Sequence, residues 1–232
     1  MRSTVSKTSS SWCDMGNPVD KASIETSLGL AAARLEGKGL LKAGDTLSQR
    51  IPEENAFVTV TIRAGQDRPY LFAWASLSGT PQGLHHRIYA ARADVGSIAA
   101  GSFTWMSALR RLDMSLPPVF DEQVRHLGVE GKRIGMRSND DLPASLFANG
   151  ANAYCLDDLS LCFGMGLERL LLNIEILEKC AECFVLAQST ARRVKTIPWL
   201  IRFIANGRLV KDRKDAAARH LRGERSIMKA GY

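Results

Sequence analysis

Residues 85–119 read HHRIYAARADVGSIAAGSFTWMSALRRLDMSLPPV, and this stretch decides the fold because it contains a helix, a strand and a second helix in direct succession. The run HHRIYAARADV has helical spacing and is predicted to end near Asp94, while the small-residue run GSIAAGS is predicted to be a strand. A second helix is expected from Thr104 to Leu112. It is closed by LPPVF, because two prolines end helical structure.

The sequence on either side repeats this alternation of helices and short strands. A helix is expected to begin near Ser23 and to stop at Gly37. Strand patterns occur in AFVTVTIRA (56–64), YLFAWASL (70–77), NAYCL (152–156) and LSLCFG (159–164), and a long amphipathic helix is expected over 166–190. Helices interspersed with strands predict an α/β protein whose sheet is covered by helices.

Length and composition suit one medium-sized soluble domain. The chain has 232 residues, of which 45% are hydrophobic and 24% charged, and these are ordinary values for a globular protein. No run approaches the roughly 18–20 apolar residues of a membrane span, so we expect a cytoplasmic protein without membrane contact. We divide the chain into a flexible N-terminal arm at 1–21, a domain at 22–190 and a basic, partly helical C-terminal tail at 191–232.

The positive charge lies in the tail. From Arg192 onward there are twelve Lys or Arg residues and three Asp or Glu residues, whereas the rest of the chain carries 19 basic and 21 acidic residues. Basic tails attract phosphate without reading sequence, but no nucleic-acid motif accompanies this one, so nucleic acid is not the expected partner. A helix is expected over 199–221, and its apolar residues need burial either on a neighbouring subunit or on the chain's own body.

Four collinear stretches resemble the class II aldolase/adducin family. GLLKAGDTLSQRIPEENAFVTV (39–60) resembles the family's Gly-Asn-Ile-Ser turn, Arg-x-Pro and strand. Residues 85–119 resemble its His-x-x-Ile-Tyr helix, Arg-Pro-Asp-Val, ligand strand and Leu-Pro-Pro. GANAYCLDDLSLCFGMGLE (150–168) resembles its strand–His-Gly–strand segment, and LLNIEILEKCAECFVLA (171–187) resembles its last large helix.

The resemblance implies a three-layer α/β/α sandwich around a central mixed, largely antiparallel sheet, usually assembled as a homotetramer. Members of the family include sugar-phosphate aldolases, an epimerase, dehydratases and decarboxylases, whereas adducin uses the fold without catalysis. Fold alone does not choose among these functions.

The family's zinc enzymes hold the metal with three histidines, two from a His-x-His strand and one from the later His-Gly. The matching positions here are Ala100, Ser102 and Asp158, and a slip of one residue would replace Asp158 by Asp157. Alanine has no donor atom and a serine hydroxyl is a poor zinc ligand. We therefore expect no metal at these positions and no cofactor.

The other family positions have changed as well. The catalytic glutamate falls on Pro81, and the substrate-binding asparagine becomes Thr46, while Ser48 is kept. His85, His86 and Asp158 could in principle form a relocated metal site. However, two adjacent helix residues point about 100° apart, so both histidines cannot comfortably face one ion.

Two functions remain open. The first is a non-zinc pseudo-aldolase that binds a small polar or anionic ligand or a partner. The second is a metal-independent lyase, decarboxylase, cyclase or isomerase in the same cleft, with Asp158 or His85 as acid or base. The substrate would then contact Thr46, Ser48, Arg50, Ser78 and Ser102, and Arg50 would hold a carboxylate or phosphate.

Overall fold

A computed structural model describes residues 19–65, 69–190 and 194–227. Its centre is one seven-stranded sheet with the order β3-β2-β1-β4-β7-β6-β5. The strands are β1 (Thr46–Ile51), β2 (Ala56–Ile62), β3 (Tyr70–Ser76), β4 (Ser97–Gly101), β5 (Lys132–Arg133), β6 (Ala153–Cys155) and β7 (Ser160–Gly164). All neighbouring strands are antiparallel except β5 and β6, which are parallel. The sheet is therefore mixed and largely antiparallel, as expected.

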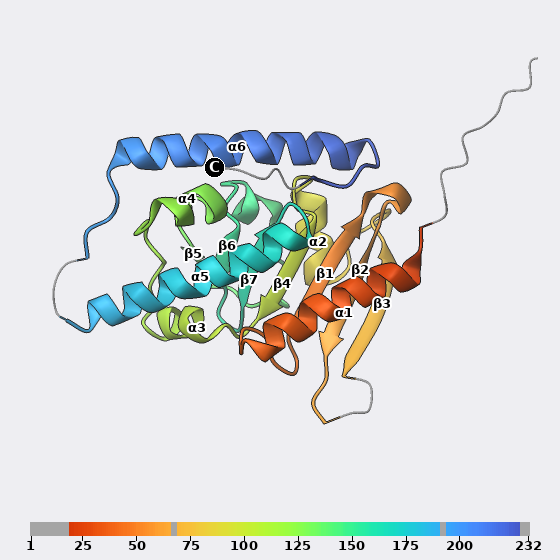
Figure 1. Cartoon of the computed structure of the whole chain (residues 1–232), viewed down its shortest axis with the longest axis horizontal. Coiled ribbons are helices and arrows are strands. Elements are labelled where there is room, and N and C mark those ends of the chain that lie inside the picture. Colours follow the sequence, from red (N-terminus) through yellow and green to blue (C-terminus); the bar gives the residue numbers. More distant parts are fainter. Residues whose placement is uncertain (1–18, 66–68, 191–193, 228–232) are drawn as a thin grey trace, which may run out of the picture.

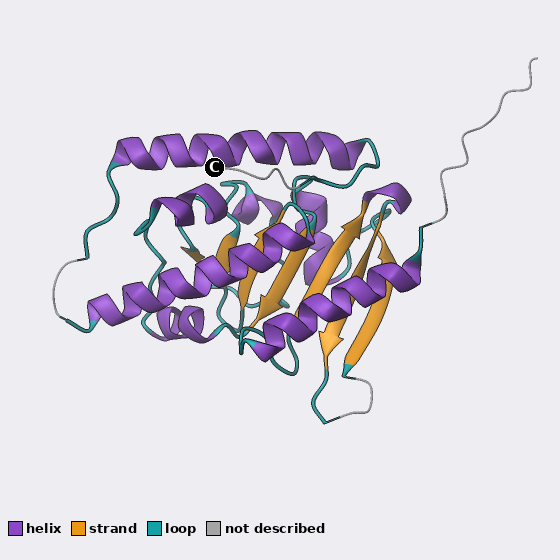
Figure 2. Cartoon of the chain, viewed as in Figure 1, coloured by secondary structure: helices purple, strands orange, loops and turns teal. Residues whose placement is uncertain are grey.

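Helices cover both faces of this sheet (Figures 1 and 2). They are α1 (Lys21–Gly37), α2 (Gly83–Ala91), α3 (Thr104–Arg111), α4 (Asp121–Leu127), α5 (Leu167–Gln188) and α6 (Trp199–Leu221), with short 3₁₀ turns η1 (Pro52–Glu54) and η2 (Ala144–Phe147). One hydrophobic core joins α1, α3 and α5 to one face, and a second joins α2 and η2 to the other. The predicted three-layer α/β/α architecture is confirmed.

Strand pairing decides which side chains share a face. Thr46 lies opposite Ala100 in the β1–β4 pair, and Ala100 lies opposite Leu161 in the β4–β7 pair. Because side chains alternate along a strand, Thr46, Ser48 and Arg50 all project toward α2, whereas Leu47 belongs to the core under α1 and α5. β1 therefore supplies polar side chains that face α2.

The predicted helices and strands agree with the structure, with three additions. β1 was not expected, because Thr46 and Ser48 were placed in a turn. The short helix α4 and the two-residue strand β5 were also not expected. The proposed N-terminal arm lies almost wholly outside the described residues, and the structure describes only its last part, where Asp20 caps α1 by accepting a hydrogen bond from the Ser23 amide.

Helix α6 spans the run predicted for it and lies along the chain's own body (Figure 1). The side of α6 that faces the body includes the buried residues Ala205, Leu209 and Ala216. Asp212 accepts a hydrogen bond from Arg125 of α4 at 2.6 Å, and this contact fixes the two helices side by side. No helix in the described part of the chain combines the length and apolarity needed to cross a membrane.

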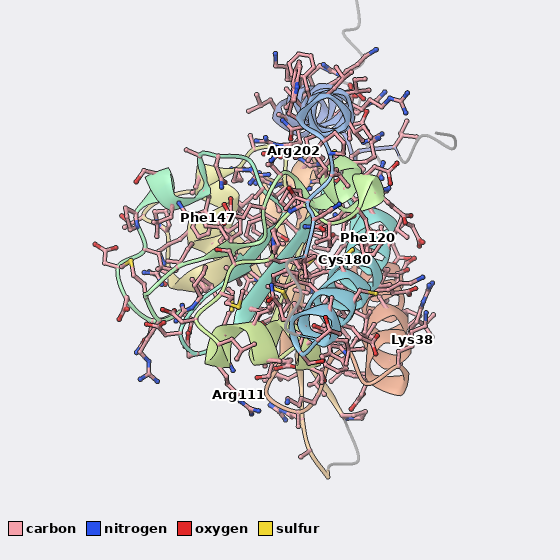
Figure 3. All side chains as sticks on the ribbon, turned by 90° about the vertical axis from the view of Figure 1, so that its left-hand side faces the viewer. Lys38, Arg111, Phe120, Phe147, Cys180 and Arg202 are labelled. Atoms are coloured by element: carbon pink, nitrogen blue, oxygen red, sulfur yellow. The ribbon has the colours of Figure 1, made fainter. Side chains whose placement is uncertain are left out.

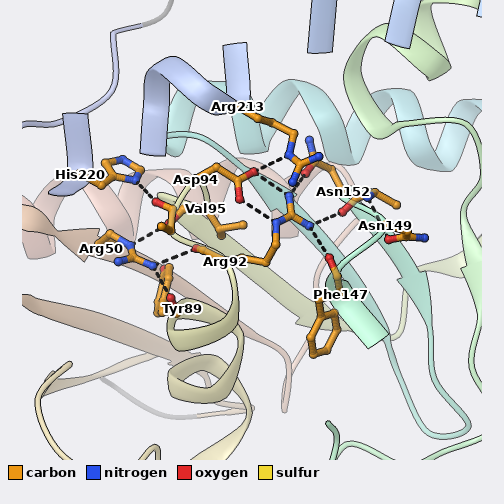
Figure 4. Close-up of polar contacts among 12 residues, drawn as sticks. Arg50, Tyr89, Arg92, Asp94, Val95, Phe147, Asn149, Asn152, Arg213 and His220 are labelled. Atoms are coloured by element: carbon orange, nitrogen blue, oxygen red, sulfur yellow. Dashed lines mark hydrogen bonds and ion pairs between the residues drawn. The ribbon is translucent and has the colours of Figure 1, made fainter. Parts of the chain in front are cut away.

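A buried ionic cluster holds α6 to the turn between α2 and β4 (Figure 4). Asp94, which is 6% exposed, accepts hydrogen bonds from Arg92 at 2.7 Å through both carboxylate oxygens and from Arg213 of α6 at 2.7 Å. Arg92 also donates to the side chain of Asn152 and to the Ala151 carbonyl. Burial acts to raise the pKa of Asp94, but the two arginines outweigh it and lower this pKa to about 2.

Replacing Asp94 by asparagine should lower the free energy of unfolding by about 3–5 kcal/mol near neutral pH, because the buried guanidinium of Arg92 and the half-buried guanidinium of Arg213 lose their counter-charge. The folded pKa of Asp94 is below its unfolded value, so its contribution is complete above the unfolded pKa and disappears as pH falls toward 2. Urea unfolding measures both effects. Asp141→Asn is the matched control, because Asp141 is fully exposed and lies 4.0 Å from Arg87. Equal stabilities for the two variants would contradict this account of the cluster.

Candidate functional site

Three of the residues predicted for the site meet at the end of β1. His85 lies between two hydroxyl groups, with its Nε2 atom 2.8 Å from Thr46 Oγ1 and its Nδ1 atom 2.6 Å from Ser48 Oγ. Ser48 Oγ is also 2.9 Å from the hydroxyl of Tyr89, one helical turn further along α2. Tyr89, Ser48, His85 and Thr46 thus form one continuous chain of hydrogen bonds, which we call the hydroxyl–imidazole chain.

The imidazole of His85 is neutral near pH 7. Burial among the surrounding side chains lowers the pKa of His85 to about 4, because the charged form loses its hydration. Burial raises the pKa of Tyr89 for the same reason. Ser48 and Tyr89 are inaccessible, whereas Thr46 is half-buried. A proton could therefore enter or leave the hydroxyl–imidazole chain only at its Thr46 and His85 end.

Arg50 and Ser78 lie elsewhere. The Arg50 guanidinium donates to the backbone carbonyls of Val95, Tyr89 and Arg92 and lies over the Tyr89 ring at 4.8 Å. Its donors therefore hold the end of α2 and the following turn. Ser78 accepts a hydrogen bond from Asn55 at the start of β2, which is the opposite end of β1 from Thr46. The structure does not bring Ser78 to His85.

The three positions that the resemblance assigns to zinc lie near one end of β4. Ala100 is buried, Ser102 follows the strand, and Asp158 lies in the turn between β6 and β7. Asp158 accepts hydrogen bonds from the amide and the hydroxyl of Ser138. Burial acts to raise the pKa of Asp158, but these hydrogen bonds outweigh it and keep the pKa below its usual value. Its neighbour Asp157 is paired with Arg133.

This donor set does not fit a zinc ion. Zinc in a catalytic site needs three nitrogen, sulfur or carboxylate ligands, and the three positions offer a methyl group, a hydroxyl and a carboxylate already engaged by Ser138. His86 does not supply a substitute, because its Nδ1 accepts from the Gln82 amide and its ring packs against Phe57. Within the described ranges, no three His, Cys, Asp or Glu side chains are grouped so that they could hold a metal.

Asp45 is a residue of this region that the sequence did not single out. Its buried carboxylate accepts hydrogen bonds from the amides of Lys42 at 2.9 Å and Ser102 at 3.1 Å. Burial raises its pKa, although the two amides act in the opposite direction. A Cβ atom at position 101 would lie 2.6 Å from the Asp45 carboxyl carbon, so only glycine fits there. Asp45 therefore sets the position of Ser102.

Ser102 opens into a small cationic cavity at the start of α3. The cavity has a volume of about 250 Å³ and is lined by Lys42, Ser102, Thr104, Ser107, Arg110 and Arg111. Three of the six side chains are basic, three carry hydroxyls and none is acidic. The Nη1 atom of Arg110 is buried and has no hydrogen-bond partner within the described chain. The lining therefore combines positive charge with hydroxyl groups, a combination that suits an anion.

The amino end of α3 does not add to this attraction. The carboxylate of Glu178, from α5, accepts hydrogen bonds from the amides of Trp105 and Met106 at 2.9 Å each. A negative side chain already satisfies these amides and offsets the positive end of the helix dipole. The positive charge of the cavity consequently comes from its own lysine and arginines. The pair Arg110-Arg111 in the sequence was the only signal that could have indicated it.

Comparison with known proteins identifies the fold. No family model and no curated protein matches the sequence. An L-fuculose 1-phosphate aldolase structure matches with a TM-score of 0.71 and 17% identity, over 84% of this chain and 100% of that chain. An L-fuculose 1-phosphate aldolase from Glaciozyma antarctica PI12 matches with a TM-score of 0.63 and 17% identity, over 89% and 92%.

An aldolase II superfamily protein from Pseudomonas syringae matches with a TM-score of 0.61 and 18% identity, over 90% of this chain and 98% of that chain. At these identities the likeness shows the fold. The chain has the class II aldolase fold, as the resemblance of its four sequence stretches predicts.

The neutral state of His85 has a consequence for stability. The folded pKa of His85, about 4, lies below the unfolded value of 6.5. The contribution of His85 to the free energy of unfolding is therefore complete above pH 6.5 and is lost as pH falls toward 4. Between pH 7 and pH 5, the free energy of unfolding should fall by about 1–2 kcal/mol less in His85→Gln than in the unchanged protein. Urea titrations of both proteins across this range measure the difference. An unchanged pH dependence in the variant would show that His85 is not held neutral.

Proposed function

We propose, from the class II aldolase fold and the side chains at its β4 edge, that this chain is a non-zinc pseudo-aldolase that binds a small anionic ligand. The observation that carries the proposal is the cationic cavity beside Ser102, where Lys42, Arg110 and Arg111 meet without an acidic partner in the lining. The cavity contains charge for holding a ligand. Its lining contains no histidine or carboxylate, and the neighbouring carboxylate of Asp45 is engaged by the amides of Lys42 and Ser102.

The chemistry of the lining favours a phosphate or carboxylate group. A guanidinium can donate two parallel hydrogen bonds to either group, and the hydroxyls of Ser102, Thr104 and Ser107 supply further donors. The volume of about 250 Å³ suits one charged group with a short carbon skeleton. Several structures with this fold are named for sugar phosphates, so small phosphorylated sugars are the first ligand class to test.

The changed zinc positions support the absence of metal-dependent carbonyl chemistry. In that chemistry a Lewis acid stabilises the enediolate, and Ala100, Ser102 and Asp158 do not provide the ligands it requires. Pro81 stands where the resemblance places the catalytic glutamate, and it has no proton to exchange. Both changes act on the same reaction, so its loss is the simplest explanation for finding them together.

The hydroxyl–imidazole chain favours one alternative, a metal-independent lyase or isomerase. A neutral imidazole with hydrogen bonds at both nitrogens can accept a proton at one and release another from the opposite side. Thr46 is the half-buried end of the chain, so a substrate would have to reach Thr46 and His85. The lining of the cationic cavity does not include either residue, and for this reason we rank binding first.

Calorimetric titration with L-fuculose 1-phosphate, inorganic phosphate and uncharged L-fuculose tests ligand binding. We expect the two anions to bind and the uncharged sugar not to bind. The double variant Arg110→Gln/Arg111→Gln should weaken anion binding by about tenfold or more, since each lost charge-assisted hydrogen bond removes about 1.5–3 kcal/mol. Lys214→Gln, an exposed charge removal on α6, is the control. Equal affinity for the sugar and its phosphate, or no effect of the double variant, would overturn the cavity as the ligand site.

Proton exchange separates the two functions, and metal content tests the premise that they share. We expect protein purified from zinc-supplemented medium to carry substoichiometric metal, because the three positions lack a fitting ligand set. We also expect no transfer of deuterium from heavy water into dihydroxyacetone phosphate, as followed by NMR. Exchange that disappears in His85→Gln but persists in Arg110→Gln/Arg111→Gln would instead favour the metal-independent enzyme. Stoichiometric zinc would contradict both proposals.

A further inference from the structure

The side of α6 that faces away from the body is apolar and basic along the whole helix. The opposite side, which meets the body, is marked by the buried residues Ala205, Leu209, Ala216 and His220. At about 100° per residue, the residues within about 60° of the outward direction are all exposed, and none of them is acidic. The larger ones, which we call the outer face, are Leu200, Phe203, Ile204, Lys211, Lys214 and Leu221.

The apolar side chains of the outer face extend into solvent at both ends of the helix. Phe203 is 71% exposed and Leu221 is 80% exposed. They are separated by about five helical turns, or about 27 Å, so they point in the same direction from α6. Trp199, which is 68% exposed, borders the outer face where the helix begins. Packing on the chain's own body therefore leaves these side chains uncovered.

Helix α6 forms one edge of the molecule (Figure 1). In the end view of Figure 3 it stands above α4 and α5, with its far side free of other elements. The outer face lies on this far side, because the buried residues of α6 are on the side toward the body. A flat surface can therefore contact the helix along its length before it reaches the rest of the domain.

The unbalanced charge of the outer face is positive. Lys211 and Lys214 are exposed and form no ion pair with any other part of the chain that the structure describes. The acidic residues of α6 lie off the outer face and are already paired. Asp212 is 2.6 Å from Arg125 of α4, and Asp215 is 3.5 Å from an arginine one turn further along α6. The outer face consequently attracts a negatively charged surface.

We propose that the outer face of α6 binds the surface of an anionic lipid membrane, with the helix axis in the plane of that surface. Helices of this kind place Trp, Phe and Leu at the boundary between headgroups and acyl chains, and they carry Lys or Arg beside them. Phe203 and Leu221 enter this boundary. The ammonium groups of Lys211 and Lys214 reach the headgroups while their aliphatic stems lie along the apolar side chains.

The absence of a membrane-spanning helix is compatible with this mode of binding. The expectation of no membrane contact rested on the lack of a spanning run in the sequence. A helix that lies in the surface plane needs no such run. Trp199 fits the same position, because tryptophan is enriched at the boundary between membrane and water. None of the outer-face residues lines the cationic cavity, so membrane binding and ligand binding are tested independently.

The aliphatic residues favour lipid over nucleic acid. A single-stranded nucleic acid binds through basic residues and aromatic rings on which its bases stack. Such a partner accounts for Phe203 and the two lysines, but it leaves Leu200 and Leu221 exposed. A lipid surface offers negative headgroups and an apolar boundary at every point along the helix. It therefore accounts for the lysines and for the apolar side chains on both sides of them.

Vesicle sedimentation of the full chain tests the proposal. We expect binding to mixed phosphatidylcholine and phosphatidylserine vesicles, and weaker binding to pure phosphatidylcholine. Leu200→Ala/Phe203→Ala should weaken binding about 100-fold through lost apolar burial. Lys211→Gln/Lys214→Gln should weaken it about 30-fold on the anionic vesicles only. Leu30→Ala/Leu186→Ala is the matched control, because both leucines are exposed, at 67% and 52%, on α1 and α5.

Circular dichroism establishes that the variants are folded. A full chain that does not bind the anionic vesicles, or a Leu200→Ala/Phe203→Ala variant that binds as well as the control, would overturn the proposal. Retention of a mixed-sequence RNA without vesicle binding would also overturn it and would assign the outer face to nucleic acid.

Tryptophan fluorescence locates the contact on the chain. Lipids with brominated acyl chains quench tryptophans that reach the membrane boundary, and Trp199 is the one beside the outer face. We expect these vesicles to quench the full chain and to lose most of this effect on Trp199→Phe, which keeps an aromatic ring for binding. Equal quenching in Trp199→Phe would show that a different part of the chain meets the lipid.

Discussion

The carboxylate of Asp94 is the contact on which the arrangement of this molecule depends most. It lies at the turn between α2 and β4, and it receives one guanidinium from that turn and one from α6. The body is shaped to admit the second one, because a Cβ atom at position 150 would lie 1.6 Å from Arg213. The imidazole of His220, which bonds to the Ala93 carbonyl, secures the far end of the helix. A basic C-terminal segment is thereby joined to a nearly neutral domain.

The turn that contains Asp94 joins α2 to β4, and each of these two elements leads to one of the candidate sites. On its α2 side stand His85 and Tyr89, bonded to the hydroxyls of β1. On its β4 side the strand leads to Ser102 and the cationic cavity. One place holds a neutral imidazole with little access, and the other holds basic side chains whose nearest carboxylate, Asp45, is bonded to the amides of Lys42 and Ser102. Catalysis needs both functions in one place, whereas binding needs only the second.

The sequence revealed the architecture better than the site. The alternating run predicted β2 and the small-residue run predicted β4, because neighbouring elements bury one or both faces of each strand. β1 was missed because TLSQRI places Thr46, Ser48 and Arg50 on one face, where they bond to α2 rather than to water. Thr46, Ser48 and His85, which the resemblance assigns to one site, lie within hydrogen-bonding distance of one another in the structure. The resemblance could not show that the Arg50 guanidinium donates to backbone carbonyls, because the positions of carbonyl groups cannot be read from a pattern of side chains. Nor could it show that α3 would direct Arg110 and Arg111 toward Ser102.

The carboxylate of Glu178 at the start of α3 has a consequence for how this protein can change. In many anion sites the main-chain amides at the start of a helix bind the anion. Such a site cannot be altered by replacing side chains, because the amides belong to the backbone of the fold. Here those amides are already occupied by Glu178, so the positive charge that would attract the proposed anion comes from three side chains of the cavity lining. Under the proposed binding function, substitutions at Lys42, Arg110 or Arg111 would change which anion is bound and would leave the main chain of the fold as it is.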